Sequence, residues 1–183
     1  MRLVSNYFPT QSHHVQSISP TMLILTFLPY TVRSNLFSVT IRCQSNKFTG
    51  EIMSITLAEA QKIMDAAIAK AEELNIKVTV SVVDNGGRTI GVNRMDGAIW
   101  ASTYGSLGKA VGASAFGRPS GVMQPRANEP TPSGVAQASG GHMILGQGAV
   151  PIIRDGNIAG ACGVGGGTSE QDEECAKAGV AAI

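Results

Sequence analysis

Three charged residues near the middle of the sequence, Arg94, Asp96 and Lys109, could together bind a carboxylate group. A guanidinium presents a planar fork that matches a carboxylate, and a lysine adds a point charge. Asp84 could orient the same ligand, and Met95 places a thioether beside Arg94. We expect Arg94 and Asp96 to form an ion pair, and such a pair often does no more than fix a loop. Both interpretations stay open.

This set of side chains is compatible with two ligand classes and with one kind of catalysis. Small diacids carry carboxylates, and haem carries two propionates. In an enzyme, Arg94 would clamp the substrate while Asp96 or Lys109 transferred a proton. Burial would then have to bring the pKa of the proton-transferring group toward neutrality.

Residues for metal or nucleophilic chemistry are scarce. Cys162 and Cys175 have no CxxC or CxxH spacing, so a structural zinc site is not expected. His142 is the only histidine after residue 14, and no G-x-S-x-G pattern is present. A single axial bond to a haem iron is still conceivable from His142, Met95 or Met143.

A run of three glycines joins a predicted strand to a predicted helix: Gly165, Gly166 and Gly167. Free backbone amides at such a junction can bind anions. Acidic residues in the first turn of the helix already neutralise its positive end, and the lysine of a phosphate-binding loop is missing. The glycines could therefore donate amides to a ligand, or they could simply form a tight turn before a helix capped by Thr168.

The elements that position Arg94 are predicted to form a β-hairpin. Residues 78–83 are rich in valine, residues 84–87 read Asp-Asn-Gly-Gly, and residues 88–93 alternate again. A hairpin is only marginally stable alone, so its apolar face requires further strands or helices. Residues 150–153 and 158–164 supply them, joined by an Asp-Gly turn.

Helices are predicted at residues 56–74, 100–116 and 169–182. Thr56 and Glu59 match a capping box at the start of the first helix. The second helix contains three glycines, which would let the sheet or a subunit partner approach closely. Residues 117–141 form a long connection rich in Pro, Gly and Ser, which is expected to cover a ligand or a neighbouring subunit, or to contain a short helix.

Composition sets the broad class of the protein. The 183 residues are enough for one domain with a sizeable core. A net charge of +1 and an aromatic content of 5% give no indication of a nucleic-acid partner. An apolar patch at residues 22–28 is far too short to span a membrane.

The composition changes near residue 53. Residues 1–52 contain no alanine, one glycine and mostly basic charges, so they are expected to stand outside the domain formed by residues 53–183. They could be a leader, a disordered extension, or an upstream stretch read through to a start at Met53. The unpaired cysteines are consistent with the cytoplasm, whereas a leader would indicate an exported or organellar protein.

Several motifs, in order, resemble the GlcG/HbpS-like haem-binding family, which includes the C-terminal domain of PduO-type proteins. They are the VVDNGG hairpin, the RMDGA run from Arg94, Lys109-Ala110, VPI followed by Asp155-Gly156, and GACGVGGGTSEQDEECAKAG. The resemblance covers Thr56 to about Ala182. One departure is the lack of a histidine in the first helix, where some relatives place one.

The resemblance implies an α/β fold with three layers, profilin-like or roadblock-like, in which helices cover both faces of a mostly antiparallel sheet. It also implies homo-oligomers and, in some members, haem or tetrapyrrole binding, while a few relatives act on hydroxymuconates as tautomerases or dehalogenases. We therefore expect a small oligomeric accessory protein that binds haem or a similar acidic ligand. An enzyme acting on small dicarboxylates, or a structural subunit, is the alternative.

Overall fold

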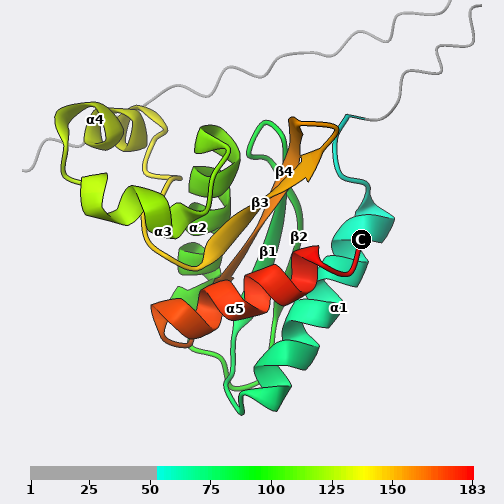
Figure 1. Cartoon of the computed structure of the whole chain (residues 1–183). Coiled ribbons are helices and arrows are strands. Elements are labelled where there is room, and N and C mark those ends of the chain that lie inside the picture. Colours follow the sequence, from blue (N-terminus) through cyan, green and yellow to red (C-terminus); the bar gives the residue numbers. More distant parts are fainter. Residues whose placement is uncertain (1–52) are drawn as a thin grey trace, which may run out of the picture. The chain divides into compact units, whose positions relative to one another are not determined.

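The computed structural model describes residues 53–183, so the expectations for residues 1–52 lie outside the described part of the chain. The described residues form a four-stranded sheet with helices (Figure 1). In chain order the elements are α1 (Leu57–Glu73), β1 (Thr79–Asp84), β2 (Thr89–Arg94), α2 (Ala101–Phe116), α3 (Ser120–Met123), the 3-10 turn η1 (Gln124–Arg126), α4 (Pro130–Ala138), β3 (Ala149–Arg154), β4 (Asn157–Gly165) and α5 (Ser169–Val180).

Helices α1 and α5 each begin just after a threonine whose hydroxyl accepts a hydrogen bond from a backbone amide of the first turn. At α1, the hydroxyl of Thr56 accepts from the amide of Glu59 at 3.2 Å, and the Glu59 carboxylate accepts from the Thr56 amide at 2.9 Å. The same reciprocal box joins Thr168 and Gln171 at α5. Both capping boxes are confirmed, because this signal is local to the sequence.

The sheet has the strand order β2-β1-β4-β3, and all neighbouring strands are antiparallel. β1 is central, with Thr79 opposite both Arg94 of β2 and Gly165 of β4. Helices α1 and α5 cover one face of the sheet, and α2 covers the other (Figure 1). This confirms the predicted α/β fold with helices on both faces of an antiparallel sheet.

The two faces are packed differently. The face toward α1 and α5 holds the main apolar core, with Ile63, Met64, Val80, Val82 and Val164 fully buried or nearly so. Burial of such aliphatic side chains stabilises the fold by roughly 1.5–3 kcal/mol each. Most of the apolar driving force therefore lies on this side.

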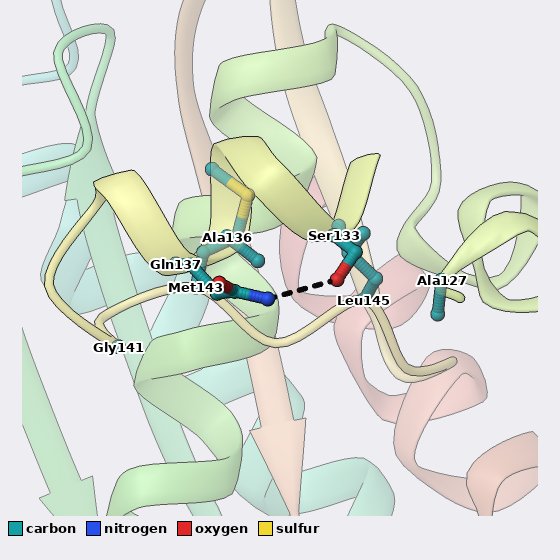
Figure 2. A pocket seen from close by; sticks show the side chains of 7 residues that line it. All are labelled: Ala127, Ser133, Ala136, Gln137, Gly141, Met143 and Leu145. Atoms are coloured by element: carbon teal, nitrogen blue, oxygen red, sulfur yellow. Dashed lines mark hydrogen bonds between the residues drawn. The ribbon is translucent and has the colours of Figure 1, made fainter. Parts of the chain in front are cut away.

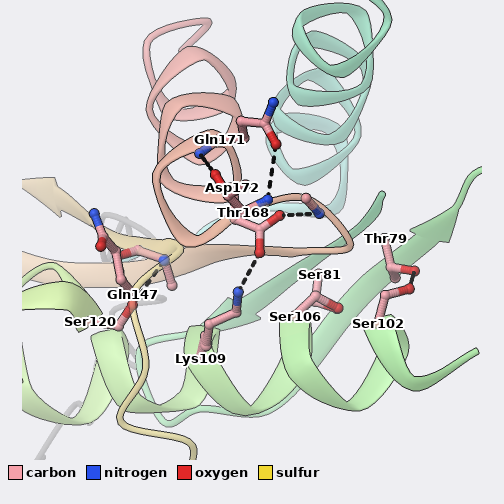
Figure 3. Close-up of polar contacts among 12 residues, drawn as sticks. Thr79, Ser81, Ser102, Ser106, Lys109, Ser120, Gln147, Thr168, Gln171 and Asp172 are labelled. Carbon is pink, nitrogen blue, oxygen red and sulfur yellow. Dashed lines mark hydrogen bonds and ion pairs between the residues drawn. The ribbon is translucent and has the colours of Figure 1, made fainter. Parts of the chain in front are cut away.

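The face toward α2 is lined by small and hydroxyl side chains. Thr79 shares a hydrogen bond of 2.6 Å with Ser102, and Ser81 one of 2.8 Å with Ser106 (Figure 3). A Cβ on Gly163 of β4 would overlap the carbonyl oxygen of Ser106. The predicted close approach of the sheet to α2 is thus made possible by a glycine of the strand.

The long connection contains α3, η1 and α4, so the expectation of short helical structure is met. After α4 the chain passes along α2 at Ile144. The amide of Ile144 donates to the carbonyl of Gly108, and its side chain fills the space beside that glycine. That residues 117–141 cover a ligand or a neighbouring subunit stays a prediction.

Within residues 53–183, none of the helices has the length and apolar character needed to cross a membrane.

Candidate functional site

Arg94 stands at the end of β2, an edge strand, with its side chain exposed. Within the part of the chain that the structure describes, no ion pair joins it to Asp96, and this differs from the expectation. Its guanidinium is therefore available for an external anion.

A hollow of about 350 Å³ lies at this end of the sheet. Its lining combines two cations, two acids and two apolar side chains: Lys77, Arg94, Glu72, Asp96, Ile68 and Met95. Met95 points inward, because its sulfur accepts from the Val78 amide at 3.5 Å and the side chain packs on the core. The sulfur thus already has one protein partner, and the role of Met95 as an axial ligand stays a prediction.

Asp84 lies at the opposite end of β1 from the residue that pairs with Arg94. Its carboxylate accepts from the amides of Gly86 and Arg88, each at 2.8 Å, and so fixes the hairpin turn. Five strand residues separate the two ends, about 16 Å. The structure therefore does not bring Asp84 and Arg94 together.

Lys109 is engaged elsewhere in the molecule (Figure 3). Its ammonium lies 2.8 Å from the carboxylate of Asp172, and the two side chains are only 10% and 5% exposed. Gly148, immediately before β3, leaves room for this pair, since a Cβ there would overlap the lysine nitrogen. The ammonium of Lys109 thus lies beside the residue that precedes β3, whereas Arg94 is on β2 at the other edge of the sheet.

This placement bears on the expected catalytic roles. A proton transfer by Lys109 to a ligand held at Arg94 would need both groups to reach one molecule near the same atoms. The ammonium of Lys109 is instead buried against Asp172. The geometry therefore does not support catalysis by Arg94 and Lys109 as a unit.

The glycine turn lies at the same end of the sheet as Arg94. Gly165 pairs with Thr79, and Gly166 packs against the backbone of Lys77. The amide of Gly167 donates to the Asp172 carboxylate at 2.9 Å, however, so it is not free for an anion. The turn shapes this end of the sheet and offers fewer amides than expected.

A second hollow, of about 280 Å³, lies between α4 and residues 141–145 (Figure 2). It is lined by Ala127, Ser133, Ala136, Gln137, Gly141, Met143 and Leu145. His142, the candidate axial ligand, is exposed and lies in the chain between two of these residues. No charged side chain lines this hollow, so it is less suited to a carboxylate than the hollow at Arg94.

Two residues of these sites were not anticipated from the sequence. Lys77 adds a cation beside Arg94, and Asp172 holds Lys109 from 63 residues away. Lys77 lies two residues before β1, so its place in the sequence beside the predicted strand could have pointed to it. Asp172 looked like an ordinary first-turn acid of α5, because its tertiary contact leaves no mark on the local pattern.

Among residues 53–183 there is no cluster of three or more His, Cys, Asp or Glu side chains that could hold a metal ion.

Relatives and solved structures are similar to this chain over most of its described part. An uncharacterized 15.0 kDa protein of Citrobacter freundii, from the dhaT-dhaS intergenic region, is 39% identical over 67% of this chain and 87% of its own length. The corrinoid adenosyltransferase PduO of the same organism is 30% identical over 72% of this chain. The chain spans only 39% of the length of PduO.

Crystal structures show the same fold. The protein ORFY of Klebsiella pneumoniae has a TM-score of 0.65 and 35% identity, covering 70% of this chain and 89% of its own. A PduOC complex with haem has a TM-score of 0.64 and 27% identity, covering 71% and 95%. HbpS has a TM-score of 0.64 and 28% identity, covering 71% and 90%.

A family model described as haem degrading protein HbpS-like matches residues 55–181, which is nearly the whole of the described fold. The match begins at the residue before the capping box of α1 and ends just after α5. The chain therefore belongs to the HbpS-like family.

Proposed function

We propose that this protein binds haem or a similar planar, acidic tetrapyrrole, and that Arg94 receives a carboxylate of the ligand. The observation that carries the proposal is the exposed guanidinium of Arg94, which lines a hollow with Lys77 and has no ion-pair partner among the described residues. An arginine fork suits a carboxylate, and a second cation nearby suits a ligand with two of them.

Membership in the family supports haem as the ligand class. The PduOC domain, whose solved structure is a complex with haem, shares the fold of this chain. Arg94 and Lys77 would pair with the propionates of such a ligand, while Glu72 and Asp96 in the same hollow offset part of their positive charge. Bound haem would supply the iron chemistry, while the chain's own cations would hold and orient the acidic edge.

Three further residues could contact the ligand: Asp96, Gly166 and His142. Asp96 lines the same hollow and would orient the guanidinium once a carboxylate is bound. Gly166 is exposed beside Lys77 and would border the ligand. His142 would reach an iron only if the ligand extended toward α4, which a His142→Ala variant tests through its visible spectrum.

The test is a titration of the full chain with hemin, followed by the Soret band. Arg94→Ala should weaken binding by roughly tenfold, the scale of one charge-assisted contact. Arg88→Ala is the matched control, because Arg88 is exposed near the other end of the same hairpin. A saturable shift that is weakened by Arg94→Ala alone supports the proposal. If both variants weaken binding equally, Arg94 acts only through its general positive charge, and the proposed pairing with a carboxylate fails.

We further propose a homo-oligomer in a reducing, cytoplasmic setting. Apolar side chains exposed away from the start of α2, among them Val122, Ile144 and Ile153, support assembly. The two buried cysteines are unpaired, and this supports a reducing compartment. Light scattering of the purified chain would measure the mass.

A further inference from the structure

An aromatic patch is exposed at the start of α2. Trp100 and Tyr104 are 71% and 69% exposed, and Ile99 beside them is 64% exposed. The two rings form an edge-to-face pair, with centroids 6.0 Å apart and planes at 88°. We call Ile99, Trp100 and Tyr104 the aromatic patch.

The packing of α2 does not account for this patch. The side of α2 that faces the sheet is formed by small residues, among them Ser102, Ser106 and Ala110. Trp100 and Tyr104 contribute nothing to that contact, although aromatic side chains bury the most apolar area per residue. Large apolar side chains grouped in water commonly mark a binding surface.

The patch lies at the same end of the sheet as Arg94. Arg94 is directly opposite Thr79 in the β1–β2 ladder, and Thr79 is hydrogen-bonded to Ser102, two residues beyond Trp100. Side chains directly opposite each other in an antiparallel pair project from the same face of the sheet. The Cβ of Arg94 therefore leaves the sheet on the side that α2 covers, near the first turn of that helix. The hollow that Arg94 lines is also bordered by Ile68 and Glu72 of α1, on the other face, so Arg94 on the edge strand β2 stands between the two faces.

We infer that the aromatic patch is the platform on which the flat apolar body of an acidic tetrapyrrole rests while its carboxylates pair with Arg94. This inference rests on the proposed function and assigns the macrocycle to residues for which no role has been established. An apolar aromatic surface next to an unpaired cation complements a ligand that is flat and apolar at its centre and anionic at one edge.

The experiment uses the full chain and hemin. Trp100→Ala combined with Tyr104→Ala should raise the Kd for hemin by roughly tenfold or more, because ring-stacking contacts of this kind are each worth a severalfold change in affinity. Both side chains are largely exposed, so their removal should leave the fold intact. Trp100→Phe with Tyr104→Phe keeps flat rings and should retain most of the affinity.

Leu57→Ala is the matched control, since Leu57 is 66% exposed at the start of α1 and lies outside the patch. Trp100 is the single tryptophan of the chain, so its fluorescence reports on the patch alone. Without hemin, acrylamide should quench Trp100 to the same extent at every protein concentration.

The outcomes separate the inference from the proposed function. If the unaltered chain shows no saturable Soret shift, both fail. If it binds hemin and the double alanine variant binds equally well, only the platform is overturned. If acrylamide quenching falls as protein concentration rises, and the double variant loses oligomer mass, a second copy covers the patch and the inference is again overturned. Selective loss in the alanine variant, with retention in the phenylalanine variant and Leu57→Ala, supports it.

Discussion

Two cysteine side chains, Cys162 in β4 and Cys175 in α5, are buried in the core that α1 and α5 form with the sheet. Burial raises the pKa of the Cys162 thiol to about 12 and that of the Cys175 thiol to about 11. The thiolate is the reactive species, so almost none of it exists near neutral pH. Buried free cysteines of this kind pack as small hydrophobic side chains.

We predict that neither thiol reacts with Ellman's reagent in the native protein at pH 8. A Cys43→Ser variant makes the two core cysteines the only ones present. Absorbance at the start should be flat, and both thiols should react after unfolding in guanidinium chloride. Rapid reaction of either thiol in the native protein would contradict the buried placement.

The buried pair of Lys109 and Asp172 gives a second prediction at this scale. Lys109→Met leaves a carboxylate buried without its cation, so urea unfolding should show a loss of about 3–5 kcal/mol. Lys70→Met is the control, because Lys70 pairs with Glu73 and Glu174 on the surface. Exposed pairs contribute about 0–1 kcal/mol, so the control should change little. Comparable losses in the two variants would show that the Lys109 pair is not buried.

The third prediction concerns pH. Hydrogen bonds from Thr56, and then the nearby Arg154, hold the pKa of Glu59 below its ordinary value of 4.5. Because the carboxyl has a lower pKa in the folded state than in the unfolded state, its charge stabilises the fold at pH values above the unfolded-state pKa. This stabilisation is lost as the pH falls through the folded-state pKa. Glu59→Gln keeps the cap geometry but removes the charge. The stability gap between the two proteins should be constant above pH 6 and close below pH 4.5 in urea titrations. If the difference in unfolding free energy between the two proteins were the same at pH 3 as at pH 7, the lowered pKa of Glu59 would be contradicted.

The sequence singled out Arg94 and Lys109 but predicted neither the absence of an Arg94–Asp96 ion pair among the described residues nor the partner of Lys109. Arg94 is exposed because β2 is an edge strand, and this depends on the strand order of the whole sheet. The partner of Lys109 is brought in by the packing of α5 against the end of the sheet. Such contacts depend on the whole fold, and a single sequence carries no local pattern for them.

At the scale of elements, the close contact between α2 and β4 depends on a glycine in the strand, which has no side chain to hold the two apart. A Cβ on Gly163 would overlap the backbone of α2, whereas a Cβ on Gly105 would have nothing within 4 Å. Helices and strands themselves were predicted well, because caps and alternation are local signals. The sequence pointed to the glycines of α2 as the close-packing surface. In the structure Gly108 and Gly112 of α2 pack against Ile144, while the close approach of the sheet to α2 depends on glycines of β4, above all Gly163.

These two glycines form a matched test. Gly163→Ala should destabilise the protein by about 1–3 kcal/mol, because α2 must move away from the sheet. Gly105→Ala should stabilise it by about 0.5–1 kcal/mol, since alanine favours a helix interior. Thermal and urea unfolding would measure both. A stable Gly163→Ala variant would mean that α2 does not approach β4 as closely as described.

At the scale of the whole molecule, several surface regions within residues 53–183 could contact the proposed ligand. They include the hollow at Arg94, the aromatic patch and the hollow between α4 and residues 141–145. The strand order β2-β1-β4-β3 puts Arg94 and the glycine turn at one end of the sheet and Asp84 at the other. This order could not be read from the sequence, because hairpin signals do not say which hairpin strands become neighbours.

The central claim is that Arg94 pairs with a carboxylate of a tetrapyrrole, and the most direct test varies both partners. Hemin and hemin dimethyl ester should be titrated against the unaltered chain and against Arg94→Ala. The unaltered chain should prefer hemin over its ester by roughly tenfold, and the variant should bind the two ligands about equally. An equal preference for hemin in both proteins would contradict a pairing between Arg94 and the ligand's carboxylates.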